Sequence, residues 1–215
     1  GAVGREVVRI LGERNFPLNE LHLLASNRSA GQTMEYNGTS LVVRETDPEI
    51  FRYVDVAFFA AGGSVSRSLA PQAVRAGALV VDKSSAWRMD ENVPLVIPEI
   101  NVDDVEKHRG IISSPNCSTI VMLMPLGPLH KSNPIIRIIV DTYQSASGAG
   151  GKGVTELLEQ TKDVMSGNDM RWSTFPHPLA FNVIPHVESF RPDGYTTEEH
   201  KLRDETRKIM HEPDM

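Results

Sequence analysis

Short apolar runs alternate with helix-like segments through the first half of the chain. The runs are bounded by Gly, Pro or polar residues and lie at 21–25, 54–61, 78–82, 95–97 and 110–113. Between the second and third runs, residues 64–76 have a helical pattern that contains Pro71. Continuous apolar strands separated by helices indicate a parallel sheet that is covered on both faces. We therefore expect an α/β fold with a doubly wound, mostly parallel sheet of the nucleotide-binding type.

The sequence pattern at both ends of the chain looks truncated. Gly1 to Gly4 lead directly into a segment with apolar side chains on one helical face, namely Val3, Val7, Val8 and Leu11. A glycine-rich turn that feeds a helix normally follows a strand, and here none precedes it. The last residues, 212–215, follow closely on another helix-like segment. The sequence thus predicts an internal piece of a longer protein, without its first strand and its C-terminal part.

The pattern changes after residue 115. We expect helices over 118–131, 152–166 and 196–211, and a long strand over 135–143. A Gly-rich loop at 145–151 and a Pro-rich stretch at 176–185 separate these elements. Longer strands with such loops suit a mixed α+β domain. We therefore predict two domains, 1–115 and 116–215.

Composition excludes several classes of protein. The net charge of −6 and the pI near 5.7 argue against a nucleic-acid-binding surface. No apolar run approaches the ~18 residues that a membrane helix needs, and the start lacks a basic leader followed by an apolar core. A single unpaired cysteine fits a reducing compartment. We expect a protein that acts on small molecules in the cytoplasm, or in the plastid of a plant, and that has no metal site.

Cys117 is the only cysteine in the chain. Pro115-Asn116 breaks the apolar run before it, and a helix-like run follows, so Cys117 should lie at a helix N-terminus. The N–H groups and the dipole at such a terminus favour a thiolate, which is the nucleophilic form. Free cysteine is also among the most buried residue types. The residues alone leave both interpretations open, a nucleophile or a small buried hydrophobic side chain.

A series of motifs runs through the whole chain. In order they are Gly1-Ala-Val-Gly4, Ala25-Ser-Asn-Arg-Ser-Ala-Gly31, Ala60-Ala-Gly-Gly-Ser64, Pro98-Glu-Ile-Asn101, Ser114-Pro-Asn-Cys-Ser-Thr-Ile120, Thr142-Tyr-Gln-Ser-Ala-Ser-Gly-Ala-Gly150, Ala180-Phe-Asn-Val-Ile-Pro185 and Tyr195-Thr-Thr-Glu-Glu-His-Lys201. Their order and spacing resemble aspartate-semialdehyde dehydrogenases, and the cysteine and glutamine motifs are the most specific. The resemblance favours the nucleophile for Cys117.

The resemblance implies a reductive dephosphorylation. In this family L-aspartyl-4-phosphate and NADPH give aspartate 4-semialdehyde, NADP and phosphate, on the route to lysine, methionine and threonine. Cys117 as thiolate would attack the acyl phosphate and form a thioester, which hydride transfer reduces. Gln144 matches the active-site glutamine of the family. The match also implies a substrate site, formed by Arg88, Asn116, Glu198 and Lys201. Ser147 and Gly148 match positions beside the nicotinamide.

Two of these assignments have ordinary alternatives. Glu198 and Lys201 are three residues apart on a predicted helix and could form a surface salt bridge. Gln144 could be a glutamine at a strand end that bonds to the backbone.

The cofactor is expected to be NADP. Gly1, Ala2 and Val3 match the end of a turn that would hold the pyrophosphate. NAD-preferring folds usually carry Asp or Glu after the second strand, whereas this chain has Ser26-Asn-Arg-Ser29. Arg28 and Ser29 would there bind a 2′-phosphate. The alternative is a polar turn with an exposed arginine.

The general acid/base of the family is a histidine between Gly and Ser, with a substrate-binding arginine shortly before it. None of the seven histidines here has that context, so we read them as surface or packing residues and expect the motif beyond Met215. By analogy we expect a homodimer or a dimer of dimers. N-acetyl-glutamyl-phosphate reductase and a non-catalytic nucleotide-binding paralogue remain alternative functions.

Overall fold

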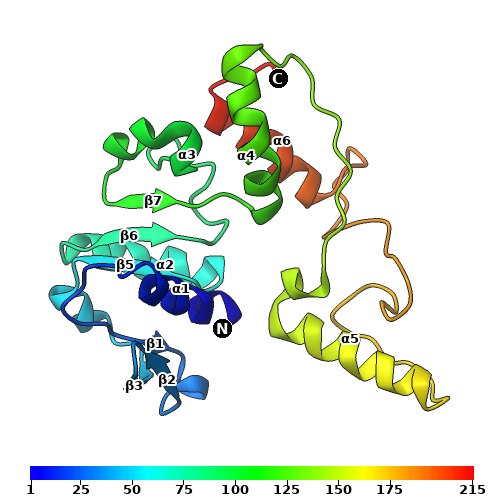
Figure 1. Cartoon of the computed structure of the whole chain (residues 1–215), viewed down its shortest axis with the longest axis horizontal. Helices are drawn as coiled ribbons and strands as arrows, with labels where there is room; N and C mark the ends of the chain where they lie inside the picture. Colours follow the sequence, from blue (N-terminus) through cyan, green and yellow to red (C-terminus); the bar gives the residue numbers. More distant parts are fainter. The chain divides into compact units, whose positions relative to one another are not determined.

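A computed structural model describes residues 1–215 and divides them into two compact units (Figure 1). The first unit comprises Ala2–Val96 and Val102–Ser114. The second comprises Ile97–Asn101 and Pro115–Met215, together with Gly1. The division of the protein into domains 1–115 and 116–215 stays a prediction.

A parallel three-stranded sheet forms the centre of the first unit. Its strands are β5 (Val56–Phe59), β6 (Leu79–Asp82) and β7 (Ile111–Ser113), in that spatial order, and α2 (Gly63–Arg75) connects the first two. The register places Phe59, Asp82 and Ser113 side by side at the carboxyl ends of the strands. Parallel strands joined by a crossover helix confirm the expected α/β fold class.

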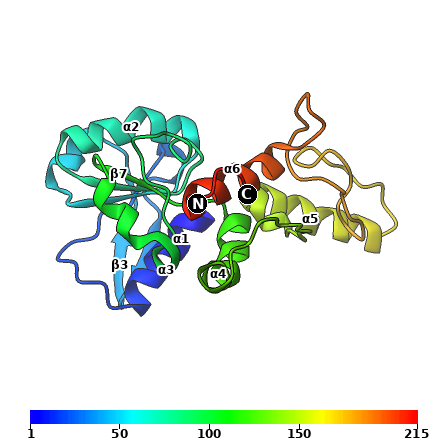
Figure 2. The same cartoon turned by 90° about the horizontal axis from the view of Figure 1, so that it is seen from above.

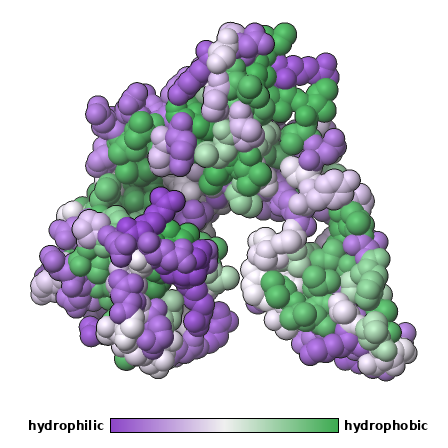
Figure 3. Space-filling model, viewed as in Figure 1, coloured by the Kyte–Doolittle hydropathy of each residue, from purple (hydrophilic) through white to green (hydrophobic).

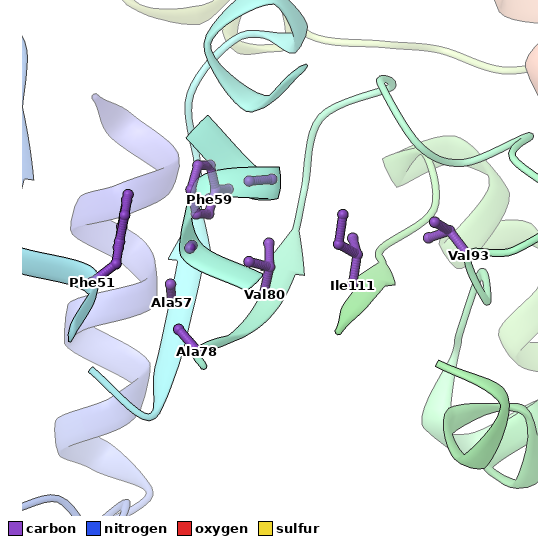
Figure 4. Close-up of a cluster of buried hydrophobic side chains, with 9 residues drawn as sticks. Phe51, Ala57, Phe59, Ala78, Val80, Val93 and Ile111 are labelled. Carbon is purple, nitrogen blue, oxygen red and sulfur yellow. The ribbon is translucent and has the colours of Figure 1, made fainter. Parts of the chain in front are cut away.

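Figure 4 shows the hydrophobic cluster that holds this sheet together. It contains Phe51, Ala57, Phe59, Ala70, Ala73, Ala78, Val80, Val93 and Ile111. Along β5, Ala57 and Phe59 are buried, but Val56 and Phe58 between them are 38% and 40% exposed. Successive side chains of a strand point to opposite faces, so only one face of β5 is covered. The expectation of a sheet buried on both faces is wrong for this strand.

The first unit also contains a hairpin that the sequence analysis missed. Strands β2 (Thr33–Tyr36) and β3 (Thr39–Val42) pair antiparallel around Asn37-Gly38, whose φ angles are 48° and 78°. A two-residue hairpin turn with positive φ at both positions is the geometry that Asn-Gly favours. This dipeptide was the signal that could have revealed the hairpin.

The remaining small elements surround the hairpin and the sheet. Helix α1 (Ala2–Glu13) buries Val8 and Leu11 of the predicted apolar face, whereas Val3 is 48% exposed. Strand β1 (Leu24–Ala25) pairs in parallel with β4 (Arg44–Glu45), and the short helices η1 (Asn27–Ser29) and η2 (Pro48–Tyr53) follow β1 and β4. The expected strand at 95–97 is wrong, because only Leu95 bridges to Ser113.

Helices dominate the second unit. They are α4 (Cys117–Ser132), α5 (Gly150–Met165) and α6 (Thr197–Met210), which confirm the helices expected over 118–131, 152–166 and 196–211. In Figure 2, α6 lies beside α4, and the short α3 (Pro98–Asn101) packs against both. Thr196 and Glu199 form a reciprocal capping box at the start of α6. None of the helices is both long enough and apolar enough to cross a membrane.

The strand expected over 135–143 does not form. The segment lies between α4 and η4 (Ala146–Ala149) and pairs with no other part of residues 1–215. A strand needs a partner for its N–H and C=O groups, and apolar alternation alone does not supply one. Most of its side chains are exposed, with Ile136 88% and Tyr143 94% exposed. Hydrophobic surface is also visible on α4 and α5 in Figure 3.

Two polar side chains of α5 hold the loop that follows it. The Glu156 carboxylate accepts hydrogen bonds from the backbone N–H groups of Ser173, Thr174 and Phe175 at 2.9, 2.7 and 3.3 Å. One turn later, Gln160 Oε1 accepts from the N–H groups of Leu179 and Ala180. Burial alone would raise the pKa of Glu156, but these N–H donors lower it to about 2.

We expect this carboxylate to make stability depend on pH. Because the folded-state pKa lies below the ordinary 4.5, ionised Glu156 stabilises the fold above pH 4.5, and this contribution is lost as the pH falls toward 2. Glu156→Gln should lower the free energy of unfolding at pH 7 by about 1–2 kcal/mol. The difference from the parent should shrink in chemical denaturation between pH 6 and pH 3.

The matched control for this prediction is the exposed Glu159 of the same helix. Glu159→Gln should change the unfolding free energy by less than about 0.5 kcal/mol at every pH. A parent-to-Glu156→Gln difference that stays constant from pH 6 to pH 3 would contradict the role assigned to the carboxylate.

Candidate active site

Cys117 is the first residue of α4 and is exposed. Asn116, with φ −58° and ψ 146°, is the N-cap, and Pro115 precedes it. The Cys117 Sγ lies 3.5 Å from Asn116 Oδ1 and 3.9 Å from Ser118 Oγ. The helix-start position is therefore confirmed, and the alternative of a small buried hydrophobic side chain is wrong. An anion at this place faces the positive end of the helix dipole.

Glu198 joins the neighbours of the cysteine into one network. Its Oε1 accepts hydrogen bonds from Asn116 Nδ2 at 2.8 Å, Gln144 Nε2 at 2.9 Å and Ser118 Oγ at 3.0 Å. The donors come from the cap of α4, its first turn and the segment before η4, while Glu198 belongs to the first turn of α6. Three segments distant in sequence thus meet at one carboxylate oxygen.

The carboxylate of Glu198 is buried, and the residue is only 5% exposed. Burial alone would raise its pKa, but hydrogen bonds from Asn116, Gln144 and Ser118 and the charge of Lys201 lower the pKa below 4.5. Lys201 Nζ lies 3.4 Å from Glu198 Oε2 and also pairs with Glu188. The ion pair between Glu198 and Lys201 exists, but the surface interpretation is wrong because one partner is buried.

A groove of about 860 Å³ opens beside the thiol. Four of the expected site residues line it, Cys117, Gln144, Ser147 and Gly148. A Cβ added to Gly148 would meet no atom of the chain within 4 Å, so its neighbours in the chain do not require glycine there. The groove therefore offers open space next to the thiol and the Gln144 amide.

Arg88 lies in the first unit and is only 8% exposed. Its Nε donates to the carbonyl oxygen of Ser114 at 3.0 Å, and its Nη2 donates to the carbonyl oxygen of Lys83 at 3.1 Å. These carbonyls immediately follow β7 and β6, so the guanidinium connects the carboxyl ends of two adjacent parallel strands. Ligands of open α/β sheets bind at such carboxyl ends.

A buried aspartate supports the loop that carries Arg88. Asp82, fully buried at the end of β6, accepts hydrogen bonds from the N–H and Oγ of Ser84, both at 2.6 Å, and from Ser66 Oγ. Trp87 Nε1 donates to the same Ser66 Oγ at 2.8 Å. The residue before Arg88 is thereby anchored to the sheet through α2.

Comparison with known proteins agrees with this arrangement. Residues 1–108 match the family model described as semialdehyde dehydrogenase, NAD binding domain, and residues 126–215 match the semialdehyde dehydrogenase dimerisation domain. The chain belongs to the semialdehyde dehydrogenase family.

Individual relatives give the same result. The chain is 47% identical to an aspartate-semialdehyde dehydrogenase of Bacillus subtilis, over 100% of this chain and 64% of that protein. A crystal structure of aspartate semialdehyde dehydrogenase II from Vibrio cholerae, complexed with ASA, superposes with a TM-score of 0.95 at 44% identity, covering 100% of this chain and 64% of that one. The resemblance to aspartate-semialdehyde dehydrogenases is confirmed. This chain spans about 64% of the length of those relatives.

A more distant member of the family has been solved with a cofactor. The aspartate semialdehyde dehydrogenase from Candida albicans, described with NADP, has a TM-score of 0.68 at 26% identity, over 98% of this chain and 57% of that one. In the present chain, Ala2 and Val3 begin α1 and are exposed at the start of the nucleotide-binding unit, next to Gly1. Arg28 and Ser29 form η1 directly after β1, with Arg28 exposed.

Sequence reasoning missed two residues of the network. Ser118 donates to Glu198, as described above, and Glu205 Oε2 accepts from the backbone N–H of Asn116 at 2.6 Å. Glu198 and Glu205 are seven residues apart, which places them on one helical face, and this spacing was the available signal. His200, expected as a surface or packing residue, is buried between Asp193 and Arg203.

Proposed function

We propose that this chain carries the cysteine centre of an aspartate-semialdehyde dehydrogenase, which reduces L-aspartyl-4-phosphate with NADPH and releases phosphate. One observation carries the proposal: the exposed Cys117 at the start of α4 shares a groove with Gln144, and Glu198 holds Gln144 and both neighbours of the cysteine. The names of the relatives and the family match support it.

The reaction begins at the thiol. The Cys117 thiolate adds to the acyl carbon, phosphate leaves with the bonding electrons, and a thioester to Cys117 remains. The uncharged Gln144 amide orients the acyl group by hydrogen bonding and neither gives nor takes a proton. The nicotinamide cofactor, when bound, supplies the hydride that reduces the thioester. The resulting thiohemiacetal anion releases the aldehyde and leaves Cys117 as the thiolate.

Further polar residues serve the rest of the substrate in this proposal. Arg88 and Lys201 bind the phosphate, and Asn116 contacts the substrate beside the cysteine. Oε1 of Glu198 already accepts three hydrogen bonds, so a substrate ammonium would approach the other oxygen, which now faces Lys201. Binding of the substrate amine and the position of Lys201 are therefore coupled through one carboxylate.

The cofactor sites are assigned by the family resemblance, and the residues concerned are exposed in the structure. Gly1, Ala2 and Val3 would hold the pyrophosphate at the start of α1, and Ser147 and Gly148 would lie beside the nicotinamide. We also propose a homodimer, or a dimer of dimers, since residues 126–215 match a dimerisation domain.

The test uses the full-length enzyme in the oxidative direction. Aspartate 4-semialdehyde, phosphate and NADP should give NADPH absorbance, and omission of phosphate should stop steady turnover. Mass spectrometry should then find an acyl adduct on the peptide that contains Cys117. Turnover with the N-acetylglutamate semialdehyde instead would favour the reductase alternative, and neither turnover nor adduct would favour the non-catalytic paralogue.

Cofactor choice gives a separate prediction. Arg28→Ala in the full-length enzyme should raise the KM for NADPH by roughly tenfold or more, because a charge-assisted pair with the 2′-phosphate is lost. The KM for NADH, which lacks that phosphate, should stay nearly unchanged. Steady-state kinetics with both cofactors measures the ratio.

The control for this prediction is Arg52→Ala. Arg52 is another exposed arginine of the first unit, which pairs with Glu49. It should leave both KM values unchanged. Equal losses with NADPH and NADH in Arg28→Ala would show a structural role for Arg28.

A further inference from the structure

We infer that Glu205 is a positioning residue for Cys117, an inference that rests on the function proposed above. Glu205 is 1% exposed and lies on α6, which packs beside α4 in Figures 1 and 2. Its Oε2 accepts a hydrogen bond from the backbone N–H of Asn116 at 2.6 Å. The contact spans 89 residues of sequence and ends one residue before the nucleophile.

The bonded N–H group is one of the donors at the start of α4 that have no partner within the helix. Asn116 is the N-cap of α4, so its N–H precedes the hydrogen bonds of the helix. Pro115 before it has no N–H at all. Glu205 therefore holds the last backbone donor before Cys117, and so fixes the direction in which the chain enters α4.

Glu205 and Glu198 bind different parts of the turn before and after Cys117. Glu198 accepts from the side chains of Asn116 and Ser118, and Glu205 accepts from the main chain of Asn116. With both in place, the turn that presents Cys117 is held from one face of one helix. Precise placement of a nucleophile contributes to rate, because small displacements from the attack geometry are costly.

The charge of Glu205 has a second, opposite effect on the thiol. We expect a carboxylate that bonds to the residue before Cys117 to oppose a second negative charge at the thiol. Charged side chains that lie near this turn include Glu198, which bonds to Asn116 and Ser118, and Lys201, which pairs with Glu198. Replacing Glu205 by Gln removes the charge of Glu205 alone and keeps an oxygen that can accept from the N–H of Asn116.

The two substitutions at this position should therefore differ. In the full-length enzyme, E205A should lower kcat by roughly 10- to 100-fold, since a hydrogen bond to a charged group is lost, and should change KM by less than about threefold. E205Q should keep kcat within about threefold of the parent. Its Cys117 should react with iodoacetamide at pH 7 at least about threefold faster, as followed by mass spectrometry of the Cys117 peptide.

The control is Glu199 on the same helix, whose carboxylate accepts from Thr196 and caps α6. E199A should lower the melting temperature while kcat stays within about threefold of the parent. The inference is overturned if E205A loses no more kcat than E199A, if E205Q fails to retain kcat, or if E205Q leaves the alkylation rate unchanged. Should E205A not fold, the two E205Q measurements decide.

Alkylation also separates this inference from the proposed function. It requires only the thiol, so a parent enzyme without aspartate-semialdehyde activity would refute the proposed function, while the alkylation rate of E205Q would still test Glu205.

Discussion

Replacing Cys117 by Ala in the full-length enzyme is expected to lower kcat by roughly a thousandfold or more. The thiolate forms the covalent bond to the substrate, and no other side chain of the groove is a comparable nucleophile. The side chain is exposed, so its removal leaves no buried cavity and should hardly affect stability. Turnover, NADPH binding and the melting temperature should be measured together, and only turnover should change.

Leu129→Ala is the control, because Leu129 is an exposed residue of the same helix that lies outside the groove. It should retain activity and NADPH binding. Residual turnover of Cys117→Ala within about tenfold of the parent would refute the nucleophile assignment.

Glu198→Ala should have the second largest effect, a fall in kcat/KM of roughly a hundredfold. Its loss leaves the side-chain donors of Asn116, Gln144 and Ser118 without their common acceptor and Lys201 without its buried partner. Unsatisfied donors in a buried place are costly, and the Gln144 amide is freed to reorient.

Glu198→Gln should be milder, because one amide oxygen can still accept from these donors. Its NH₂ group would face either Lys201 or a donor, so part of the loss remains. Steady-state kinetics of both variants measures the difference.

A double-mutant cycle with Gln144→Ala tests the shared role. If Glu198 acts by orienting Gln144, the loss caused by Gln144→Ala should be much smaller in the Glu198→Ala background. Additive losses would contradict this coupling.

The pH dependence supplies another check on Glu198. Its folded-state pKa lies below the ordinary 4.5, so its contribution to stability is present above pH 4.5 and is lost as the pH falls through the folded-state pKa. If kcat/KM of the parent falls as the pH is lowered at values above pH 5, a group other than Glu198 causes the fall. Glu198→Gln should then show the same fall. Disappearance of this fall in the variant would contradict the lowered pKa.

Local patterns in the sequence determined much of the helical and parallel framework. The predicted helices at 152–166 and 196–211 formed because their hydrophobic periodicity and terminal residues act over one or two turns. The predicted helix at 118–131 also formed, although it contains Pro125 and Pro128. The break at Pro115-Asn116 likewise placed Cys117 at a helix start. The Asn37-Gly38 hairpin was equally local and could have been predicted.

Only the tertiary structure decided which of these elements found partners. The apolar pattern at 135–143 predicted a strand, but the hydrogen bonds of a strand belong to two segments, and no second segment of the chain pairs with it. The same limit applies to the buried carboxylates. Spacing places Glu198, Lys201 and Glu205 on one helix face, but it cannot show what that face meets.

That face meets the start of α4, about 80 residues earlier in the chain. There Glu198 loses water and gains three donors, and Glu205 gains the N–H of Asn116. Helix periodicity acts between neighbours a few residues apart, whereas burial and hydrogen-bond partners depend on the packing of distant segments. For this reason the sequence identified the cysteine and its helix, and the tertiary structure decided which carboxylates hold them.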